Sequence, residues 1–372
     1  MRVALVHDWL NGMRGGEKVF EVLCELFPDA DVFTLVYEPQ RVSPLINSMK
    51  VRMPALMRWM PALRRRYRYL LPFLPAMAEG LPVRGYDLVI STSHCVAKGV
   101  RPKPEDTPHI CYCFTPMRYV WDRYEDYFGD RRRPESWLMP LFRRNLQQWD
   151  VDSAARVTHF LTSSQYVRAR IREHYLREAL VVPPPVNCAL FGETERAPED
   201  FFLVVSALEP YKRVDLAVEA FRYLRLPLKI AGTGSQERRL RRAAPPHVEF
   251  LGWVDDHELA SLYSRARALI FTADEDFGIV PLEAAASGCP VIAYGHGGAL
   301  ETVIEGKTGL FFPEQSQASL CSAIEQFDKM TFDEDFMRDH ARQYDRPVFK
   351  KRLGEVIHTL AGAMDRSTAQ AT

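Results

Sequence analysis

The chain has 372 residues, 47% of them hydrophobic, which is enough for two or three domains with large buried cores. Lys and Arg together number 48, as do Asp and Glu, and this balance excludes a chain-wide electrostatic attraction to nucleic acid. No apolar run reaches the roughly 18 residues of a spanning helix, and the short N-terminal apolar run, which ends at His7, is not a secretory signal. Seven scattered cysteines fit a reducing compartment, so we expect a soluble cytoplasmic protein.

The first half of the chain alternates between strands and helices. Its predicted strands are 2–7, 31–36, 87–92, 109–114, 158–162 and 180–182. Helices are predicted after Gly15, near 136–156, and from Ser164 to about His174. Three consecutive prolines, Pro183–Pro185, cannot continue a helix or a central strand, so we place a domain boundary near Val186.

The second half repeats the alternation. Its predicted strands are 202–206, 228–231, 248–251, 268–272, 290–293 and 309–312, and its predicted helices are 212–223, 235–243, 256–264, 278–288 and 316–327. Such alternation indicates a doubly wound parallel sheet. We therefore expect an α/β protein with two similar domains, 1–186 and 187–346, and a ligand-binding cleft between them. A last amphipathic helix within 347–372 is expected to pack back on the first domain.

An acidic turn precedes the Ala-rich helix that begins at Gly278. The glycine would let a phosphate approach the amides of Gly278, Ile279 and Val280, at the positive end of the helix. Glu275 either caps this helix or serves a ligand. Glu283 lies inside an otherwise small and apolar helix, where a carboxylate either faces solvent or accepts hydrogen bonds from a ribose diol. Spacing alone does not choose between these roles.

The run EDFGIVPLE from Glu275 to Glu283, followed by AAASGCPVIA, resembles the signature of family-4 retaining glycosyltransferases. The resemblance extends over nearly the whole chain and is nearest to bacterial surface-polysaccharide and O-antigen mannosyltransferases. It implies the GT-B fold, two Rossmann-like domains facing each other across a cleft, with no metal or other cofactor. It also implies that Glu275 orients the transferred sugar and that Glu283 holds the ribose of a nucleotide-sugar donor.

Two further turns of the second domain resemble donor-binding turns of this family. In Leu208–Asp215, Lys212 matches a lysine that meets the donor diphosphate and is therefore a catalytic candidate. Ala207 stands where the family has an arginine, and Arg213 is the candidate replacement. In the turn that would line the nucleobase, we expect Trp253 and Val254 to meet the base. Asp255 is expected to cap the following helix.

The first domain has a glycine pair, Gly15 and Gly16, that resembles the family's loop for close approach of the donor or acceptor. A turn and helix start are the alternative role. Gly297 and Gly298 resemble a second such turn. Many relatives carry a histidine where Phe114 stands, which removes that expected contact. Three basic side chains are candidates for contacts with the acceptor: His94, Lys98 and Arg118.

Two patterns invite a metal-site interpretation that we do not favour. Asp150 and Asp152 form an Asp-x-Asp pair, but residues two apart point in different directions on a helix. His109, Cys111 and Cys113 share a strand face without a fourth ligand, so buried small side chains are the better interpretation. We expect no metal site.

The interval between Glu38 and Glu79 is basic and rich in aromatic residues, centred on 41–75. It contains no acid and eight cations: Arg41, Lys50, Arg52, Arg58, Arg64, Arg65, Arg66 and Arg68. No recognised nucleic-acid module accompanies it, and nucleic acid is not an expected partner. The segment fits contact with an anionic membrane surface. The alternative is a solvated helical hairpin on the first domain.

The resemblance implies a retaining, metal-independent hexosyltransferase. GDP-mannose is the favoured donor, because the blocks Tyr211–Asp215 and Thr115–Tyr119 look most like those of mannosyltransferases. The expected acceptor is a glycan or a polyprenyl-diphosphate-linked oligosaccharide at the inner face of the plasma membrane. Two alternatives remain. One is a nucleotide-sugar epimerase or hydrolase of the same fold, and the other is a catalytically silent scaffold subunit, which Ala207 would favour.

Overall fold

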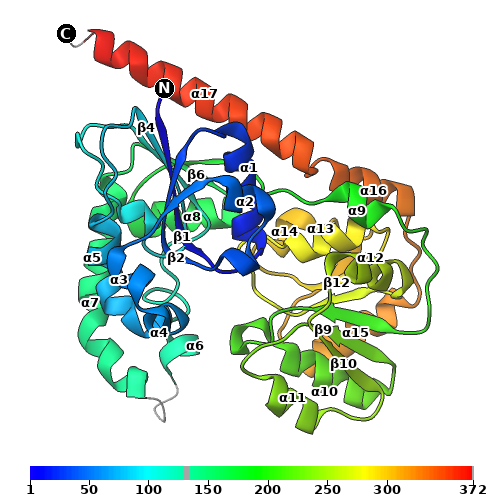
Figure 1. The fold of residues 1–372 in the computed structure, drawn as a ribbon. Helices are drawn as coiled ribbons and strands as arrows, with labels where there is room; N and C mark the ends of the chain where they lie inside the picture. The colour runs from blue at the N-terminus through cyan, green and yellow to red at the C-terminus, as the bar shows by residue number, and fades with distance from the viewer. Residues whose placement is uncertain (130–133, 371–372) are drawn as a thin grey trace. The chain divides into compact units, whose positions relative to one another are not determined.

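The computed structural model describes residues 1–129 and 134–370, which divide into two compact units. Unit 1 consists of Met1–Pro184 and the segment that begins at Phe349, and unit 2 is Pro185–Val348. Each unit is built on one parallel sheet with helices packed around it (Figure 1). Unit 2 is therefore a continuous stretch of chain inserted into unit 1.

Unit 1 has a seven-stranded sheet in the order β3-β2-β1-β4-β5-β6-β7. Its strands are β1 (Val3–Leu10), β2 (Asp31–Tyr37), β3 (Lys50–Arg52), β4 (Leu88–Ser93), β5 (His109–Cys113), β6 (His159–Thr162) and β7 (Ala179–Val181). Its helices are α1 (Gly15–Leu26), α2 (Pro44–Ser48), α3 (Ala55–Trp59), α4 (Pro61–Arg65), α5 (Leu74–Glu79), α6 (Tyr124–Phe128), α7 (Pro134–Ala155), α8 (Gln165–Tyr175) and most of α17 (Arg346–Gln370). Three 3-10 turns complete it: η1 (Pro39–Arg41), η2 (Tyr67–Phe73) and η3 (Ala97–Gly99).

Unit 2 has a six-stranded sheet in the order β10-β9-β8-β11-β12-β13. Its strands are β8 (Phe202–Val205), β9 (Leu228–Ala231), β10 (Val248–Gly252), β11 (Leu269–Phe271), β12 (Val291–Tyr294) and β13 (Gly309–Phe312). Its helical elements are α9 (Cys188–Gly192), η4 (Pro210–Lys212), α10 (Val214–Leu224), α11 (Glu237–Ala243), α12 (Asp256–Arg265), α13 (Ile279–Ala286), α14 (Ala299–Thr302), α15 (Gln317–Phe327) and α16 (Glu334–Arg342).

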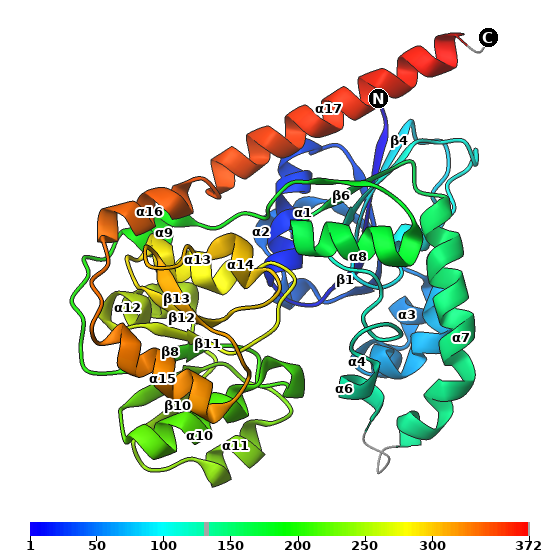
Figure 2. The ribbon, with the colours of Figure 1, turned by 180° about the vertical axis from the view of Figure 1, so that it is seen from behind.

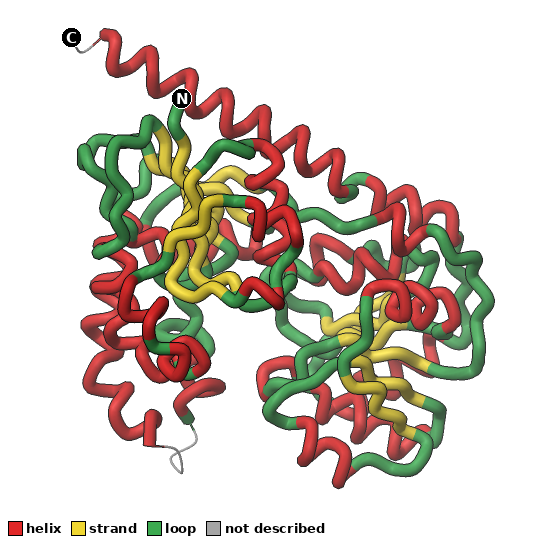
Figure 3. Tube along the Cα trace, viewed as in Figure 1, coloured by secondary structure: helices red, strands yellow, loops and turns green. Residues whose placement is uncertain are grey.

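Both faces of each sheet are covered, as Figures 2 and 3 show, so the central strands are apolar runs with little alternation. Every residue of β1 is buried. Ala4 and Val6 pack in one core cluster of unit 1, and Val3 and Leu5 pack in the cluster on the opposite face. Side chains four apart on α17 complete that second cluster: Phe349, Leu353 and Ile357.

Several element boundaries differ from prediction. β1 continues to Leu10, beyond the predicted end at residue 7, because it keeps pairing with β2 and because its polar side chains find buried partners. The edge strand β3 was not predicted, because it has only three residues, and neither was α16, whose buried residues include only two apolar ones, Met337 and Ala341. The helix predicted from residue 212 begins at Val214, and Lys212 ends the turn η4.

A buried ion pair joins three elements of unit 1. Lys98 in η3 is 1% exposed, and its Nζ lies 2.5 Å from Oδ1 of Asp150 in α7. The other carboxylate oxygen of Asp150 accepts hydrogen bonds from Trp121 Nε1 and from the Tyr175 hydroxyl of α8, each at 2.8 Å. The ammonium group also lies 5.0 Å from the ring centroid of Trp149. This network fixes the loop after β4 to α7 and α8.

Replacing Lys98 with Met should destabilise unit 1 by about 3–5 kcal/mol, because the change leaves the Asp150 carboxylate buried without its cation. Urea unfolding followed by tryptophan fluorescence measures this, since Trp253 alone lies in unit 2 and the other tryptophans lie in unit 1. The exposed Lys103→Met is the matched control, with an expected change within about 0.5 kcal/mol. Equal unfolding midpoints for the two variants would contradict the structural role of Lys98.

Candidate functional site

The strand order of unit 2 reverses between β8 and β11, and open α/β sheets bind ligands beyond the carboxyl ends of the strands at such a point. Three turns meet there. The turn after β8 carries Lys212, the turn after β11 carries Glu275, and the turn after β12 carries Gly297 and Gly298. The Thr272 hydroxyl donates to the Lys212 carbonyl at 2.9 Å, which holds the first two turns together.

Lys212 and Glu275 form an ion pair across this point. Their side chains are only 13% and 24% exposed, so the pair is partly shielded from water. The ammonium group also lies 5.1 Å from the ring centroid of Tyr211. Glu275 is not the N-cap residue of α13, because Gly278 occupies that position. The two predicted catalytic residues are therefore in contact with each other.

Gly278 adopts a backbone conformation that favours glycine. Its φ is +97°, and a Cβ at this position would lie 2.9 Å from the Thr302 hydroxyl oxygen. Ile279 and Val280 follow as the first residues of α13. The amides of these three residues thus lie at the positive end of the helix dipole, beside the turn that carries Glu275.

Gly298 allows the turn after β12 to touch the turn after β11. A Cβ on Gly298 would lie 2.2 Å from the Cα of Phe277, and the Gly298 amide donates to the Glu275 carbonyl at 2.7 Å. The same two turns are joined by His296 and Asp274, whose Nδ1 and Oδ1 atoms are 3.0 Å apart. The backbone that carries Glu275 is therefore held from both sides.

Glu283 is buried in α13, with 7% of its surface exposed. The Tyr263 hydroxyl of α12 donates to Glu283 Oε2 at 3.3 Å. Burial, followed by the nearby Glu283 carboxylate, raises the pKa of Tyr263 well above its ordinary value, so the phenol remains a donor. Tyr263 was missed from sequence, because nothing distinguishes it there from an ordinary aromatic side chain on the apolar face of a helix.

The other residues of unit 2 that were predicted to contact the donor are Arg213, Trp253 and Val254. Arg213 precedes α10 in a left-handed conformation, and its Nε lies 3.3 Å from Asp215 Oδ1. Trp253 follows the edge strand β10, where its side chain is 77% exposed, while Val254 packs partly against the core. The predicted cap is confirmed, since the Asp255 side chain accepts from the Glu258 amide at 2.8 Å. Ala207 is exposed and adds no charge.

The strand order of unit 1 reverses between β1 and β4, and Asp8 of β1 contacts the loop that follows β4. The carboxylate is fully buried and accepts four consecutive backbone N–H groups of the loop after β4, at 2.7–3.0 Å: those of His94, Cys95, Val96 and Ala97. The imidazole of His94 also lies close, with Nδ1 3.2 Å from Asp8 Oδ2. Asp8 therefore positions the predicted acceptor residue His94.

Gly15 and Gly16 are the first residues of α1. A Cβ on Gly16 would lie 3.3 Å from the Phe114 ring and 3.8 Å from the His7 ring, so the absence of a side chain lets α1 approach both. His7 bonds to the Thr92 hydroxyl at 2.6 Å, and burial lowers its pKa to about 3, which keeps it neutral. Burial also raises the pKa of Glu17.

The prediction that Lys98 contacts an acceptor is wrong, because its ammonium group is buried against Asp150. Arg118 is half-buried in the loop after β5. Cys111 and Cys113 are buried in a core cluster, and His109 bonds to the Ser91 hydroxyl. Within residues 1–129 and 134–370, no group of three His, Cys, Asp or Glu side chains is placed to hold a metal ion.

The role of Asp8 in holding the loop after β4 was not predicted. A local signal existed, because an acid inside an apolar strand needs buried partners. Those partners lie more than 80 residues away, so the sequence could not name them.

The described part of the chain contains no helix with the length and apolar character needed to cross a membrane.

Residues 190–344 match the family model described as "Glycosyl transferases group 1". Glycogen synthase of Mycobacterium tuberculosis is 30% identical over 209 residues, which cover 52% of this chain and 50% of the relative. O-antigen chain mannosyltransferase C of Escherichia coli is 29% identical over 140 residues, covering 36% and 38%. The chain spans about half the length of the first curated relatives it matches.

The likeness to solved structures extends over nearly the whole chain. HepE of Anabaena, in complex with UDP-glucose, superposes with a TM-score of 0.66 at 18% identity, over 96% of this chain and all of the other. This supports a common fold, with two Rossmann-like parallel-sheet units. The chain therefore has the GT-B fold, and its residues 190–344 match the model of the group 1 glycosyl transferases.

Proposed function

We propose that the protein is a retaining, metal-independent glycosyltransferase that moves a sugar from a nucleoside-diphosphate donor to a glycan or lipid-linked acceptor. The observation that carries the proposal is the ion pair of Lys212 with Glu275 at the strand-order reversal of unit 2, beside the positive end of α13. This is an arrangement of one cation, one carboxylate and several amides in a partly shielded turn. It suits a sugar diphosphate, which needs charge neutralised at the phosphates and hydroxyls bound at the sugar.

The cation and the carboxylates have different roles in the transfer. As the bond from the anomeric carbon to the phosphate oxygen breaks, negative charge grows on the departing diphosphate. Lys212 and the amides of Gly278, Ile279 and Val280 stabilise that charge. Glu275 accepts hydrogen bonds from the sugar, and Glu283 accepts them from the ribose. The acceptor oxygen bonds to the anomeric carbon on the face the phosphate leaves, and its proton passes to the departing phosphate.

On the acceptor side, we assign His94 and Arg118 to hydroxyl or phosphate groups of the incoming molecule. Asp8 fixes the backbone of His94 and faces one ring nitrogen at 3.2 Å, so the imidazole is held in one orientation. Gly15 and Gly16 supply backbone amides at the start of α1. Trp253 and Val254 are assigned to the nucleobase and Arg213 to the diphosphate.

We propose GDP-mannose as the donor. The relationship to an O-antigen mannosyltransferase supports mannose. Other relatives differ, since one is a glycogen synthase and a structural relative holds UDP-glucose, so the donor has to be measured.

We also propose that unit 1 contacts the inner face of an anionic membrane. Figures 1 and 2 both show α3, α4, α6 and the start of α7 at one end of unit 1, and several residues of this part of the chain have exposed apolar side chains. They include Leu56, Trp59, Met60, Tyr69 and Phe73 of the basic segment, and Trp137 and Leu141 of α7. The α7 residues extend the surface beyond the segment predicted from sequence.

Some cations of that segment have local partners. Lys50 and Arg52 pair with Asp31 of β2, and Arg64 pairs with Glu38. The side chains of Arg65 and Arg68 lie outside the described part of the structure. Of the remaining cations, Arg41, Arg58 and Arg66, we assign Arg58 of α3 and Arg66, which follows α4, to the proposed contact. A protein bound to the membrane through this surface would reach a lipid-linked acceptor without needing a spanning helix.

A donor panel tests the proposed activity. The full chain, incubated with GDP-mannose and UDP-sugars together with a polyprenyl-diphosphate-linked oligosaccharide, should release nucleoside diphosphate from GDP-mannose only when acceptor is present. Chelation of divalent ions with EDTA should leave the rate unchanged. Release of nucleoside diphosphate without acceptor would identify a hydrolase, and formation of an epimerised donor would identify an epimerase. Binding of a donor without turnover of any donor would identify a silent subunit.

The two glutamates should fail differently when changed to Gln. Glu275→Gln should lower kcat by about 10²–10³-fold with little change in KM for the donor, because its contact strengthens in the transition state. Glu283→Gln should mainly raise the donor KM, because a ribose contact persists throughout the reaction. Steady-state kinetics measures both, with the exposed Glu314→Gln as control and thermal unfolding as the check on folding. Identical kinetic defects would contradict the separate roles.

Three exposed tryptophans allow a matched test of membrane contact. Trp59 and Trp137 are 74% and 72% exposed on unit 1, and Trp253 is 77% exposed on unit 2. In flotation with anionic vesicles, Trp59→Ser and Trp137→Ser should each reduce bound protein, whereas Trp253→Ser should not. Equal loss in all three, or undiminished binding in the first two, would remove this surface from the proposal.

A further inference from the structure

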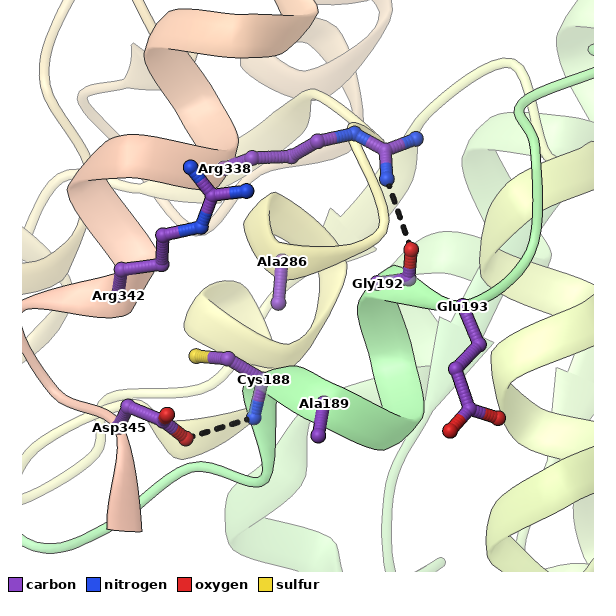
Figure 4. A pocket seen from close by; sticks show the side chains of 8 residues that line it. All are labelled: Cys188, Ala189, Gly192, Glu193, Ala286, Arg338, Arg342 and Asp345. Carbon is purple, nitrogen blue, oxygen red and sulfur yellow. Dashed lines mark hydrogen bonds between the residues drawn. The ribbon is translucent and has the colours of Figure 1, made fainter. Parts of the chain in front are cut away.

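Unit 2 contains a pocket at the end of α13 away from Gly278. It has a volume of about 350 Å³ and lies between α9, α16 and the last turn of α13 (Figure 4). Three small residues line it: Ala189, Gly192 and Ala286. A water molecule occupies roughly 30 Å³ in the liquid, so the pocket has room for a small organic molecule. The length of α13, about 12 Å, separates this pocket from the proposed donor turn.

Two arginines of α16 line the same pocket. Arg338 and Arg342 are four residues apart, so they lie on one side of the helix. Arg338 Nη1 donates to the Gly192 carbonyl at 3.1 Å, which holds this side chain across the pocket. Arg342 pairs with Asp339, and both of these side chains are about two-thirds exposed, so the pairing is weak and open to exchange. Each guanidinium has five N–H donors, which leaves donors for a ligand.

The two acidic residues of the lining either bond to backbone N–H groups or point away from the arginines. Asp345 Oδ1 accepts backbone N–H groups of Cys188 at 3.1 Å and Arg346 at 2.9 Å. Figure 4 shows the Glu193 side chain directed away from both arginines. The Cys188 thiol donates to the Ala341 carbonyl, and burial raises its pKa to about 12, so it is neutral. The lining holds two arginines and two carboxylates, and the guanidinium groups supply the N–H donors that an anion can use.

We infer that this pocket binds a small molecule bearing a phosphate group, with the phosphate between Arg338 and Arg342 and its remaining atoms against Ala189, Gly192 and Ala286. Planar guanidinium groups donate pairs of hydrogen bonds to phosphate oxygens, and two of them on one helix face match a tetrahedral anion better than a single cation does. The site goes beyond the proposed transferase activity and shares no residue with it.

Cys188 provides a readout that does not depend on catalysis. It is half-buried, whereas the other six cysteines are buried, so iodoacetamide at alkaline pH should alkylate Cys188 first. Cys188→Ser identifies that reaction by its loss. The probes are inorganic phosphate and a hexose monophosphate, at ionic strength held constant with sodium chloride. At about ten times its Kd, a bound probe should slow alkylation about tenfold and raise the Tm.

The exposed Arg342→Gln should abolish this protection while the protein remains folded, and Arg239→Gln on α11 is the control that should retain it. Arg338→Gln should also abolish it, provided that thermal unfolding shows an intact fold. Protection by inorganic phosphate supports the site. Protection by the hexose monophosphate but not by inorganic phosphate also supports it, and shows that the sugar part of the molecule is needed. The inference is overturned if neither probe slows alkylation, if chloride protects as well, or if Arg342→Gln retains full protection.

Discussion

The reversal of strand order is the constraint on which both units depend. At this point the connections that follow two neighbouring strands run in opposite directions across the parallel sheet. The turns beyond the two strands therefore diverge, and no backbone ladder joins those turns. In unit 2 the gap is closed by the ion pair of Lys212 with Glu275, and in unit 1 by the Asp8 carboxylate with four amides. Charged groups that would be costly elsewhere in a core are satisfied here by each other in unit 2 and by backbone amides in unit 1. The same groups are the ones that a charged, hydroxyl-rich ligand can use.

The two closures differ in how they are made. Asp8 is fully buried and its carboxylate accepts from four amides of one loop, so it holds the structure around His94. Lys212 and Glu275 retain partial exposure, and their turns are braced by glycine contacts and by the pair of His296 with Asp274. A braced turn with an accessible ion pair can exchange that pair for ligand contacts without moving its backbone, which is the pre-organisation that charge stabilisation requires.

Much of the fold was predictable, because buried parallel strands are short apolar runs that can be recognised directly in the sequence. The three-residue β3 and the mostly polar α16 carry too little of that signal. Glu275, Lys212, Gly278 and Glu283 were predicted as site residues because their motif is continuous or lies in recognisable turns, and the structure places Lys212 beside Glu275. Lys98 was misjudged because a lysine near a strand end looks the same whether it meets solvent or a buried aspartate 52 residues later. Tyr263 was missed for a similar reason, since its partner lies on another helix.

The insertion of unit 2 near the end of unit 1 has a consequence for synthesis. Phe349, Leu353 and Ile357 of α17 cover a core cluster formed otherwise by the first 182 residues. The ribosome makes all of unit 2 before it reaches them, which takes roughly 10–30 s at 5–20 residues per second. During that interval one apolar face of unit 1 lacks its last helix, while unit 2 emerges as one uninterrupted stretch. The nascent chain thus exposes an apolar surface on the unit whose synthesis starts first, and the inserted unit is fully synthesised before that surface can be covered.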